Sequence, residues 1–169
     1  MTDSFQNIAV TSFPDIVKID FKSINNKYLK VVLIHVFLVF LILFAALFIA
    51  DYSGVFKIVE NTFWLYFIVF IVFIAVLVLK SIGFKKMKYV VREKDISYKK
   101  GVFFRSLTTV PFNRIQHIEI DEGPVSRFFK LVSLSVFTAG DSSDDLKISG
   151  LLKEEAQQIK EFISNKIDG

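Results

Sequence analysis

Two long runs without a charged residue constrain the fold of this chain more than any other feature. Residues 31–50 read VVLIHVFLVFLILFAALFIA, and residues 62–79 read TFWLYFIVFIVFIAVLVL. As helices, these 20 and 18 residues are about 30 and 27 Å long, which matches the hydrocarbon core of a bilayer. The rest of a 169-residue chain is too small to enclose two such helices in a soluble domain. We therefore expect two membrane-spanning helices, over 31–50 and 62–79.

Composition agrees with a membrane protein and excludes several kinds of site. The chain is 53% hydrophobic with a mean hydropathy of +0.49. It has no cysteine, which excludes disulfides, thiolate metal sites and cysteine nucleophiles. The first apolar run follows some 30 mixed residues and no clear small-residue cleavage site comes after it. We expect both runs to stay in the mature protein.

Lysine and arginine residues near the two runs predict the orientation in the membrane. The turn between the runs holds Lys57 as its single cation, whereas cations cluster outside them: Lys18, Lys22, Lys27 and Lys30 before the first, and Lys80, Lys85, Lys86, Lys88 and Arg92 after the second. Cytoplasmic flanks carry the excess of positive charge. The expected division is a cytoplasmic N-terminal segment (1–28), a transmembrane helical hairpin (29–82) and a cytoplasmic domain (88–169), with both termini in the cytoplasm.

After the second run the pattern changes to short strand-length segments separated by turn residues. In LVSLSVF, Val132, Leu134 and Val136 point to one face and the intervening serines to the other, as in a half-buried strand. KKG at 99–101 predicts a hairpin turn in which glycine takes positive φ. Pro111 cannot donate to a ladder and is expected at a strand boundary or on an edge. These segments predict a small antiparallel sheet system.

The last segment, LLKEEAQQIKEFISNKI, predicts one amphipathic helix. Apolar residues recur at helical spacing with charged residues between them: Leu152, Ala156, Ile159, Ile163 and Ile167. This stripe needs a covering surface, and the open end or face of the preceding sheet is the available one.

The order of these elements resembles a known family. Tyr89, Gly101, TVPFNRIQHIEIDEG, RFFKL running into LSVFTAG, and ISGL before a closing helix follow one another in residues 88–169. This is similar to the bacterial membrane-anchored pleckstrin-homology-like domain family of the YdbS/YdbT type, and the hydrophobic hairpin with its lead-in resembles the short YdbS-like member. The resemblance implies a split or strongly bent antiparallel β-barrel closed by the C-terminal helix. It also implies the bacterial inner membrane.

The resemblance assigns structural roles to several residues. Those that match the family motif are Tyr89, Gly101, Pro111, Ile115, Gln116, Gly123 and Gly140. Residues 123–128 would form a turn and a short helical corner before the next strand. Lys130 stands where the family usually has glycine in a Gly-Leu pair.

No residue set in the sequence predicts catalysis. A glycine-rich phosphate loop, HExxH and GxSxG are all missing, and the two histidines are His35, in a membrane run, and His117, in an expected strand. We expect a neutral His35 packed near the interface, and His117 with Glu119 on a solvated strand face. The acidic GDSSDD segment (Asp141, Asp144, Asp145) lacks the spacing of a calcium loop and predicts a solvated turn. We expect no metal and no cofactor.

A cluster of positive charge remains. Residues 80–105 hold nine lysines and arginines against Glu93 and Asp95, a local balance of +7 in a chain whose net charge is +4. The positive-inside flank explains part of it, and each further cation held near an anionic leaflet contributes up to about 1 kcal/mol. The candidate lipid-surface contacts are Lys85, Lys86, Lys88, Lys99, Lys100 and Arg105.

The sequence therefore predicts a non-enzymatic membrane protein that presents a pleckstrin-homology-like interaction domain to the cytoplasm. Its expected partners are membrane lipids, and other membrane or cytoplasmic proteins and a homo-oligomer are left open. The expected role is in envelope-associated processes. Nucleic acid is not expected, because the basic cluster is held at a membrane and lacks a recognition motif. The alternative is an accessory subunit of a larger membrane transporter or stress-response complex, since the spans lack the charged pairs of a transport path.

Overall fold

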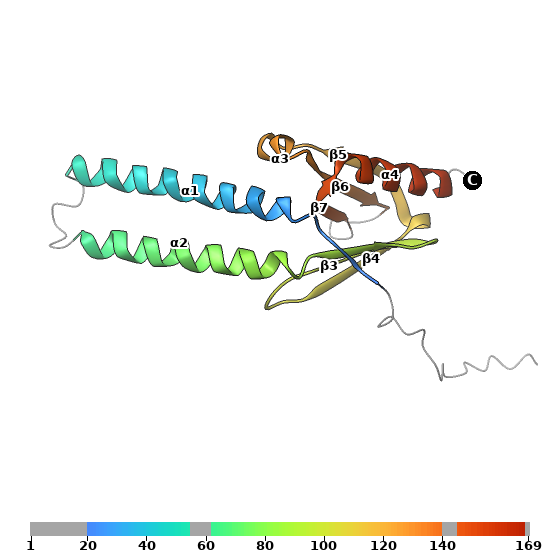
Figure 1. Cartoon of the computed structure of the whole chain (residues 1–169), viewed down its shortest axis with the longest axis horizontal. Helices are drawn as coiled ribbons and strands as arrows, with labels where there is room; N and C mark the ends of the chain where they lie inside the picture. The colour runs from blue at the N-terminus through green and yellow to red at the C-terminus, as the bar shows by residue number, and fades with distance from the viewer. Residues whose placement is uncertain (1–19, 55–61, 140–144, 168–169) are drawn as a thin grey trace, which may run out of the picture.

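The computed structural model describes residues 20–54, 62–139 and 145–167. A pair of long helices forms one end of the molecule, and the strands with the remaining helices form the other (Figure 1). The elements are β1 (Lys22–Ser23), α1 (Lys27–Tyr52), α2 (Phe63–Phe84), β2 (Lys88–Val91), β3 (Asp95–Lys100), β4 (Ser106–Pro111), η2 (Phe112–Arg114), β5 (Ile115–Asp121), α3 (Pro124–Phe128), β6 (Leu131–Thr138), β7 (Leu146–Leu152) and α4 (Lys153–Ile167).

Helices α1 and α2 are long and apolar enough to cross a membrane, with mean hydropathies of 3.1 and 2.8 over their most apolar windows. The two helices lie side by side, and Phe40 and Phe73 meet with ring centroids 5.0 Å apart. The predicted runs at 31–50 and 62–79 account for most of both helices. Each helix continues beyond its run at the end nearest the sheets, α1 beginning at Lys27 and α2 ending at Phe84.

The strands form two antiparallel sheets, one with the order β1-β2-β3-β4 and one with the order β5-β6-β7. Strand β1 precedes α1, yet it pairs with β2, which follows α2; Lys22 lies opposite Tyr89 and Ser23 opposite Lys88. The helical hairpin is therefore inserted between two neighbouring strands of one sheet. The expected segment 1–28 contributes a strand to the sheet of the following domain, and the boundaries 1–28, 29–82 and 88–169 stay a prediction.

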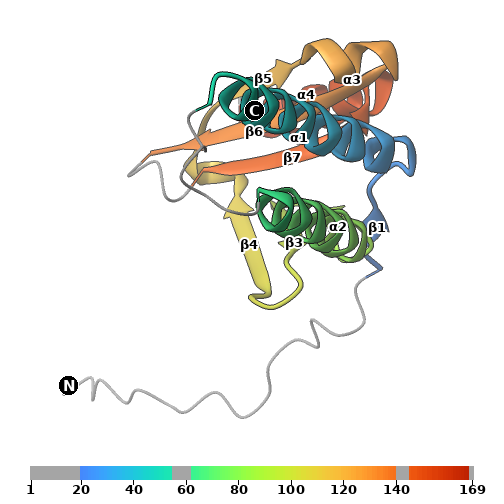
Figure 2. The same cartoon turned by 90° about the vertical axis from the view of Figure 1, so that its left-hand side faces the viewer.

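The base of the hairpin is packed into the domain. The amide of Ile24 donates to the carbonyl of Met87 (3.4 Å), which joins the two chain segments at the end of the hairpin. The amide of Asn25 donates to the carbonyl of Gly150 on β7 (3.3 Å). Ile24 and Phe84 are buried in the same core as the sheets. Seen along the hairpin, α1 lies in front of the sheet that contains β6 and β7, with α3 above it, and α2 lies in front of β3 (Figure 2).

Irregular pairing brings the core side chains of the three-stranded sheet to one face. Ile115 pairs with Thr138 and His117 with Phe137, so Gln116 is an extra residue that bulges from β5. The bulge lets Ile115 and Ile118, three positions apart, both point into the core, while Gln116 is exposed. Gly150 occupies a second irregularity, between β6 and β7, with φ +85°.

The predicted alternation in β6 is confirmed, but its second face is more covered than a half-buried strand implies. Val132, Leu134 and Val136 lie in the core. Ser135 points to the other face and is still only 6% exposed, and its hydroxyl donates to Asp121 on β5 (3.0 Å). A substitution at Ser135 is therefore not a surface change.

The predicted amphipathic helix is α4, which packs against the three-stranded sheet and buries Ala156 and Ile163 completely. It begins only at Lys153, so Leu152 of the predicted stripe ends β7 instead, and Ile167 is exposed. The expected helical corner is α3, with Gly123 at its N-cap. The two antiparallel sheets are separate in their hydrogen bonding, so closure of a barrel stays an expectation. Lys130, at the position of the family's glycine, has φ +58° and is the one non-glycine residue with positive φ among those described.

Candidate functional site

The loop between β3 and β4, residues 101–105, lies beside the end of α2. Gly101 begins it with φ +107°, and a Cβ there would lie 1.8 Å from the carbonyl oxygen of Phe104. Glycine is thus required by both the backbone angle and the space. Val102 packs on the helix, 3.3 Å from the position that a Cβ on Gly83 would take. The hairpin and the positive φ of Gly101 are confirmed, but the tight turn predicted at 99–101 is misplaced, because Lys99 and Lys100 are still paired in β3 and the connection is the longer loop 101–105.

Two phenylalanines at the tip of this loop are exposed. Phe103 is 78% exposed and Phe104 is 93% exposed. Residues of a folded domain rarely leave two adjacent aromatic rings in water without a partner for them. The loop lies at the hairpin side of the domain (Figure 1), beside the end of the apolar helix α2.

An apolar pocket of about 470 Å³ separates the loop from the two helices. Leu79 lines this pocket together with Phe103 and Phe104. Leu79 lies five residues before the end of α2, or about 7.5 Å along the helix axis. The tip of the loop therefore reaches back to the level at which the predicted span ends. The remaining lining residues are Tyr28, Val32, Lys80, Gly83, Phe84, Met87, Lys100, Gly101, Val102 and Ser106.

A second pocket, of about 250 Å³, adjoins the first and is basic. The structure brings all six candidate cations together here with Gly101, and no other described residue lines the pocket: Lys85, Lys86, Lys88, Lys99, Lys100 and Arg105. The first two follow α2, the next three belong to β2 and β3, and the arginine ends the loop. We call this the basic pocket, and we call its neighbour the apolar pocket.

The charges of the basic pocket are uncompensated. All six side chains are exposed, and in the described part of the chain none forms an ion pair. Lys88 and Lys99 are cross-strand partners, although like charges directly opposite each other destabilise a sheet. The acids of the same hairpin, Glu93 and Asp95, lie at its far end, where Asp95 accepts from Arg92 (2.7 Å). This arrangement suits an external anion.

A partly buried polar cluster joins β1 and β2 to the C-terminal helix. The Tyr89 hydroxyl donates to the Glu155 carboxylate, which also accepts from Lys22 (2.5 Å). Burial, together with the hydrogen bond to Glu155 and its negative charge, raises the pKa of Tyr89. Burial alone would raise the pKa of Glu155, but the hydrogen bonds from Lys22 and Tyr89 and the positive charge of Lys22 lower it. Tyr89, expected as a structural residue, here links β2 to α4.

The other residues of the family motif lie in turns and in the core. Pro111 ends β4, which is an edge strand, as its lack of an N–H predicts. Ile115 is buried, and Gln116 is the exposed residue of the β5 bulge. Gly123 begins α3. Gly140 lies outside the described residues.

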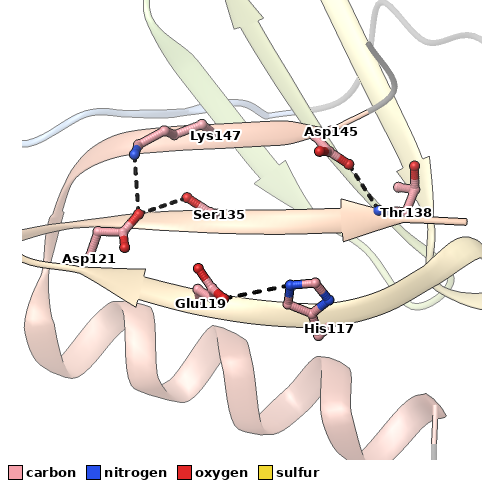
Figure 3. Close-up of polar contacts among 7 residues, drawn as sticks. All are labelled: His117, Glu119, Asp121, Ser135, Thr138, Asp145 and Lys147. Carbon is pink, nitrogen blue, oxygen red and sulfur yellow. Dashed lines mark hydrogen bonds and ion pairs between the residues drawn. The ribbon is translucent and has the colours of Figure 1, made fainter. Parts of the chain in front are cut away.

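The polar residues considered for catalysis or metal binding do not come together in the part of the chain that the structure describes. His117 and Glu119 are 3.6 Å apart and more than half exposed on the outer face of β5, where Figure 3 shows them with their neighbours. His35 contacts the carbonyl of Val31 (2.8 Å) within its own helix. Asp141 and Asp144 lie outside the described residues. Within residues 20–54, 62–139 and 145–167, no group of three potential ligands lies close enough to hold a metal.

Sequence reasoning missed the exposed aromatics of the loop and the outer network of the three-stranded sheet. In KKGVFFR the three apolar residues are typical of a core strand, and only the flanking cations indicate an interfacial segment. The network depends on nonlocal pairing, because Asp121 accepts from Lys147 on β7 (3.1 Å) and from Ser135 on β6 (Figure 3). These hydrogen bonds, first that from Lys147, lower the pKa of Asp121.

Comparison with known proteins gives one family and several relatives. The family model described as "Bacterial PH domain" matches residues 28–167. The UPF0699 transmembrane protein YdbS of Bacillus subtilis (strain 168) is 29% identical over 91 residues, which cover 54% of this chain and 55% of YdbS. The UPF0699 transmembrane protein YdbT of the same organism is 28% identical over 97 residues, covering 57% of this chain and 20% of YdbT. The match thus spans about half of one relative and a fifth of the other.

A solved structure is similar over part of the chain. It is the crystal structure of a DUF1696 family protein with a pleckstrin-homology domain from Shewanella loihica PV-4. The sequences are 24% identical, the match covers 48% of this chain and 70% of that one, and the TM-score is 0.37.

Proposed function

Because the chain belongs to the bacterial PH domain family and is a membrane protein with two helices able to span a bilayer, we propose that it holds its PH domain against the anionic leaflet. The carrying observation is the basic pocket, where six unpaired cations meet beside two exposed phenylalanines at the end of α2. In this proposal the cations contact lipid phosphates and the aromatic rings enter the interface. The domain is a non-catalytic interaction module.

The same proposal places the protein in the bacterial cytoplasmic membrane with both termini in the cytoplasm. The support is the distribution of charge: the cations lie at the domain end of the hairpin, whereas its far turn contains Lys57 alone. Anionic lipids give the cytoplasmic leaflet a negative surface potential that attracts such cations. An enzymatic reporter fused after Gly169 that works only outside the cytoplasm would contradict this orientation.

The absence of cysteine allows a direct test of lipid contact in the full-length chain. Ser106→Cys places a unique thiol beside the apolar pocket, and Glu93→Cys places one in the turn between β2 and β3, at the opposite end of β3. That end lies roughly 17 Å farther along the strands. Each thiol carries a polarity-sensitive fluorophore, and the protein is placed in nanodiscs that contain lipids with a nitroxide quencher at the headgroup.

We expect the label at residue 106 to be quenched strongly in nanodiscs containing phosphatidylglycerol and less in pure phosphatidylcholine. The label at residue 93 should be quenched weakly in both. Reversal of Lys99, Lys100 and Arg105 to glutamate should abolish the dependence on anionic lipid, and salt should weaken it. Quenching at residue 106 that ignores lipid charge, or survives the triple reversal unchanged, would refute the proposal.

A second candidate, an accessory subunit of a larger membrane complex, is favoured by one separate surface. Phe128 on α3 is 84% exposed and lies away from the basic pocket, in a helix that packs next to α1. Exposed aromatic surface of this kind fits a protein partner. This candidate predicts that a second membrane protein copurifies with the wild-type chain at fixed stoichiometry and does not copurify with Phe128→Ser. A partner that copurifies with both the wild type and the variant would show that the contact lies elsewhere.

A further inference from the structure

The apolar pocket and the basic pocket share a wall. Lys100 and Gly101 line both of them, so the two spaces meet at the first residues of the β3–β4 connection. One space is bounded by side chains of the membrane helices, such as Val32 and Leu79. The other is bounded almost wholly by cations. An apolar surface and a basic surface are therefore contiguous at the domain end of the two long helices.

The apolar pocket is also more enclosed than a lipid-facing helix surface. Tyr28 and Val32 of α1 form one side, Leu79 and Gly83 of α2 form another, and the loop with Phe103 forms a third. The loop is held in place by the contact of Val102 with Gly83 and by the positive φ of Gly101. A surface with three built sides selects for a ligand more strongly than the open face of a single helix does.

The chemistry of the combined surface matches one kind of ligand. A free anion such as phosphate would use the basic pocket alone, and a neutral lipid or detergent chain would use the apolar pocket alone. A phospholipid with an anionic headgroup presents negative charge directly next to its glycerol and acyl chains, and would fill both. Lysine serves such a boundary well, since its apolar stem lies along the chain while its ammonium reaches the headgroup.

We propose that the two pockets form one site for a single anionic phospholipid, with the headgroup in the basic pocket and the start of its acyl chains in the apolar pocket. This inference rests on the proposed function, but it is narrower. Contact with a charged leaflet requires only many weak, exchanging lipids, whereas a single site saturates at one lipid per chain. Binding at a single site also depends on the shape of the apolar pocket, whereas general electrostatic attraction to the leaflet does not.

Native mass spectrometry of the full-length protein tests the stoichiometry. The protein, purified in a neutral detergent, is titrated with phosphatidylglycerol or with phosphatidylcholine of the same acyl chains. We expect binding of phosphatidylglycerol to saturate at one lipid per chain. Binding of phosphatidylcholine should not saturate. Glycerol 3-phosphate, which has the charge without the chains, should not displace the bound lipid. Retention that rises with lipid concentration without a plateau, or equal displacement by glycerol 3-phosphate, would overturn the inference.

A matched pair of variants on α1 tests the apolar pocket. Val32→Trp fills it, whereas Val39→Trp makes the same change two turns along the same helix face, at a residue that is 62% exposed. Saturable retention should be lost in the first variant and kept in the second. If Val32→Trp does not fold, Lys100→Gln provides the second test: loss of one charge should weaken phosphatidylglycerol binding about five-fold. Unchanged binding in both variants would overturn the inference.

The labelled Ser106→Cys protein separates this inference from the proposed function. If the single site is wrong and leaflet contact is right, Val32→Trp keeps the quenching that depends on anionic lipid and the wild type shows no saturating lipid. If leaflet contact itself is wrong, the quenching that depends on anionic lipid is already missing in the labelled protein without the Val32→Trp substitution.

Discussion

Gly150 is the residue at which the structure makes its sharpest prediction about stability. It lies at the irregularity between β6 and β7 with φ +85°, directly against the start of α1. A Cβ at this position would lie 2.5 Å from Cγ of Tyr28 and 2.6 Å from Cγ2 of Ile24. Real Cβ atoms do not approach other heavy atoms so closely, so Gly150→Ala must displace the base of the hairpin, the strand or both.

The expected cost of Gly150→Ala has two parts. Holding a residue with a Cβ in the left-handed region costs about 1–2 kcal/mol. Overpacking of a site between the buried Ile24 and the partly buried Tyr28 costs about 1–3 kcal/mol. The sum, about 2–5 kcal/mol, is a large fraction of the roughly 5–15 kcal/mol by which domains are stable. Gly123→Ala is the matched control, since its Cβ would meet nothing closer than Ser126 Oγ at 3.9 Å and its φ is −76°.

Urea titration of the full-length protein in mild detergent, with pulse proteolysis to detect the unfolded domain, measures this difference. The midpoint should fall strongly for Gly150→Ala and change little for Gly123→Ala. Hydrogen exchange gives a local readout, because the Asn25 amide that donates to Gly150 should lose protection first. Equal midpoints for the two variants would refute the inference that the hairpin base is tightly packed against β7.

Three further predictions concern the domain. Val136→Asp should unfold the domain, because an unpaired carboxylate would replace a side chain with no exposure. Ser135→Asp should also destabilise the domain, since the new carboxylate would face Asp121. A urea midpoint equal to that of the wild type in either variant would contradict the register of β6. Lys130→Gly should raise the free energy of unfolding by up to about 1 kcal/mol, because its positive φ suits glycine, and a decrease would show that the lysine side chain has a compensating contact. Because the pKa of Glu155 is lowered on folding, this carboxylate stabilises the fold above its ordinary value of 4.5, and the contribution is lost as pH falls through the lowered pKa. Glu155→Gln should flatten the acid limb of stability against pH, and parallel curves would contradict this assignment.

Much of the fold follows from local patterns in the sequence. Uncharged length predicts the two helices, and alternation predicts β6, because both depend on residues close together in the chain. The convergence of the basic residues also depends mostly on short-range pairing, since Lys88 and Lys99 lie on the two strands of one β-hairpin. The family resemblance adds the position of Lys130, whose positive φ explains why glycine is usual there.

Features that depend on distant pairing could not be predicted. Strand β1 is only two residues long and has no periodic pattern, and the whole hairpin, residues 24–87, separates it from its partner β2. The exposure of Phe103 and Phe104 is equally hidden, because an apolar tripeptide in a soluble domain is ordinarily core. Only the position of the loop beside α2 shows that these rings face the membrane end of the molecule.

Insertion of the helical hairpin between β1 and β2 reduces the binding energy that the basic pocket must supply for lipid contact. The connections from β1 to α1 and from α2 to β2 are three residues each, residues 24–26 and 85–87, and they are hydrogen bonded to one another. A domain joined in this way has little freedom to swing relative to the hairpin. In the proposed function its basic pocket therefore stays near the leaflet, and the anionic lipids determine how closely the β3–β4 loop contacts the headgroups. Little orientational freedom is then lost on contact, and weak individual interactions suffice. The cations are therefore not needed to recruit the protein, which the apolar helices hold in the membrane. Charge reversal should consequently leave the protein in the membrane fraction and change only which lipids the β3–β4 loop contacts.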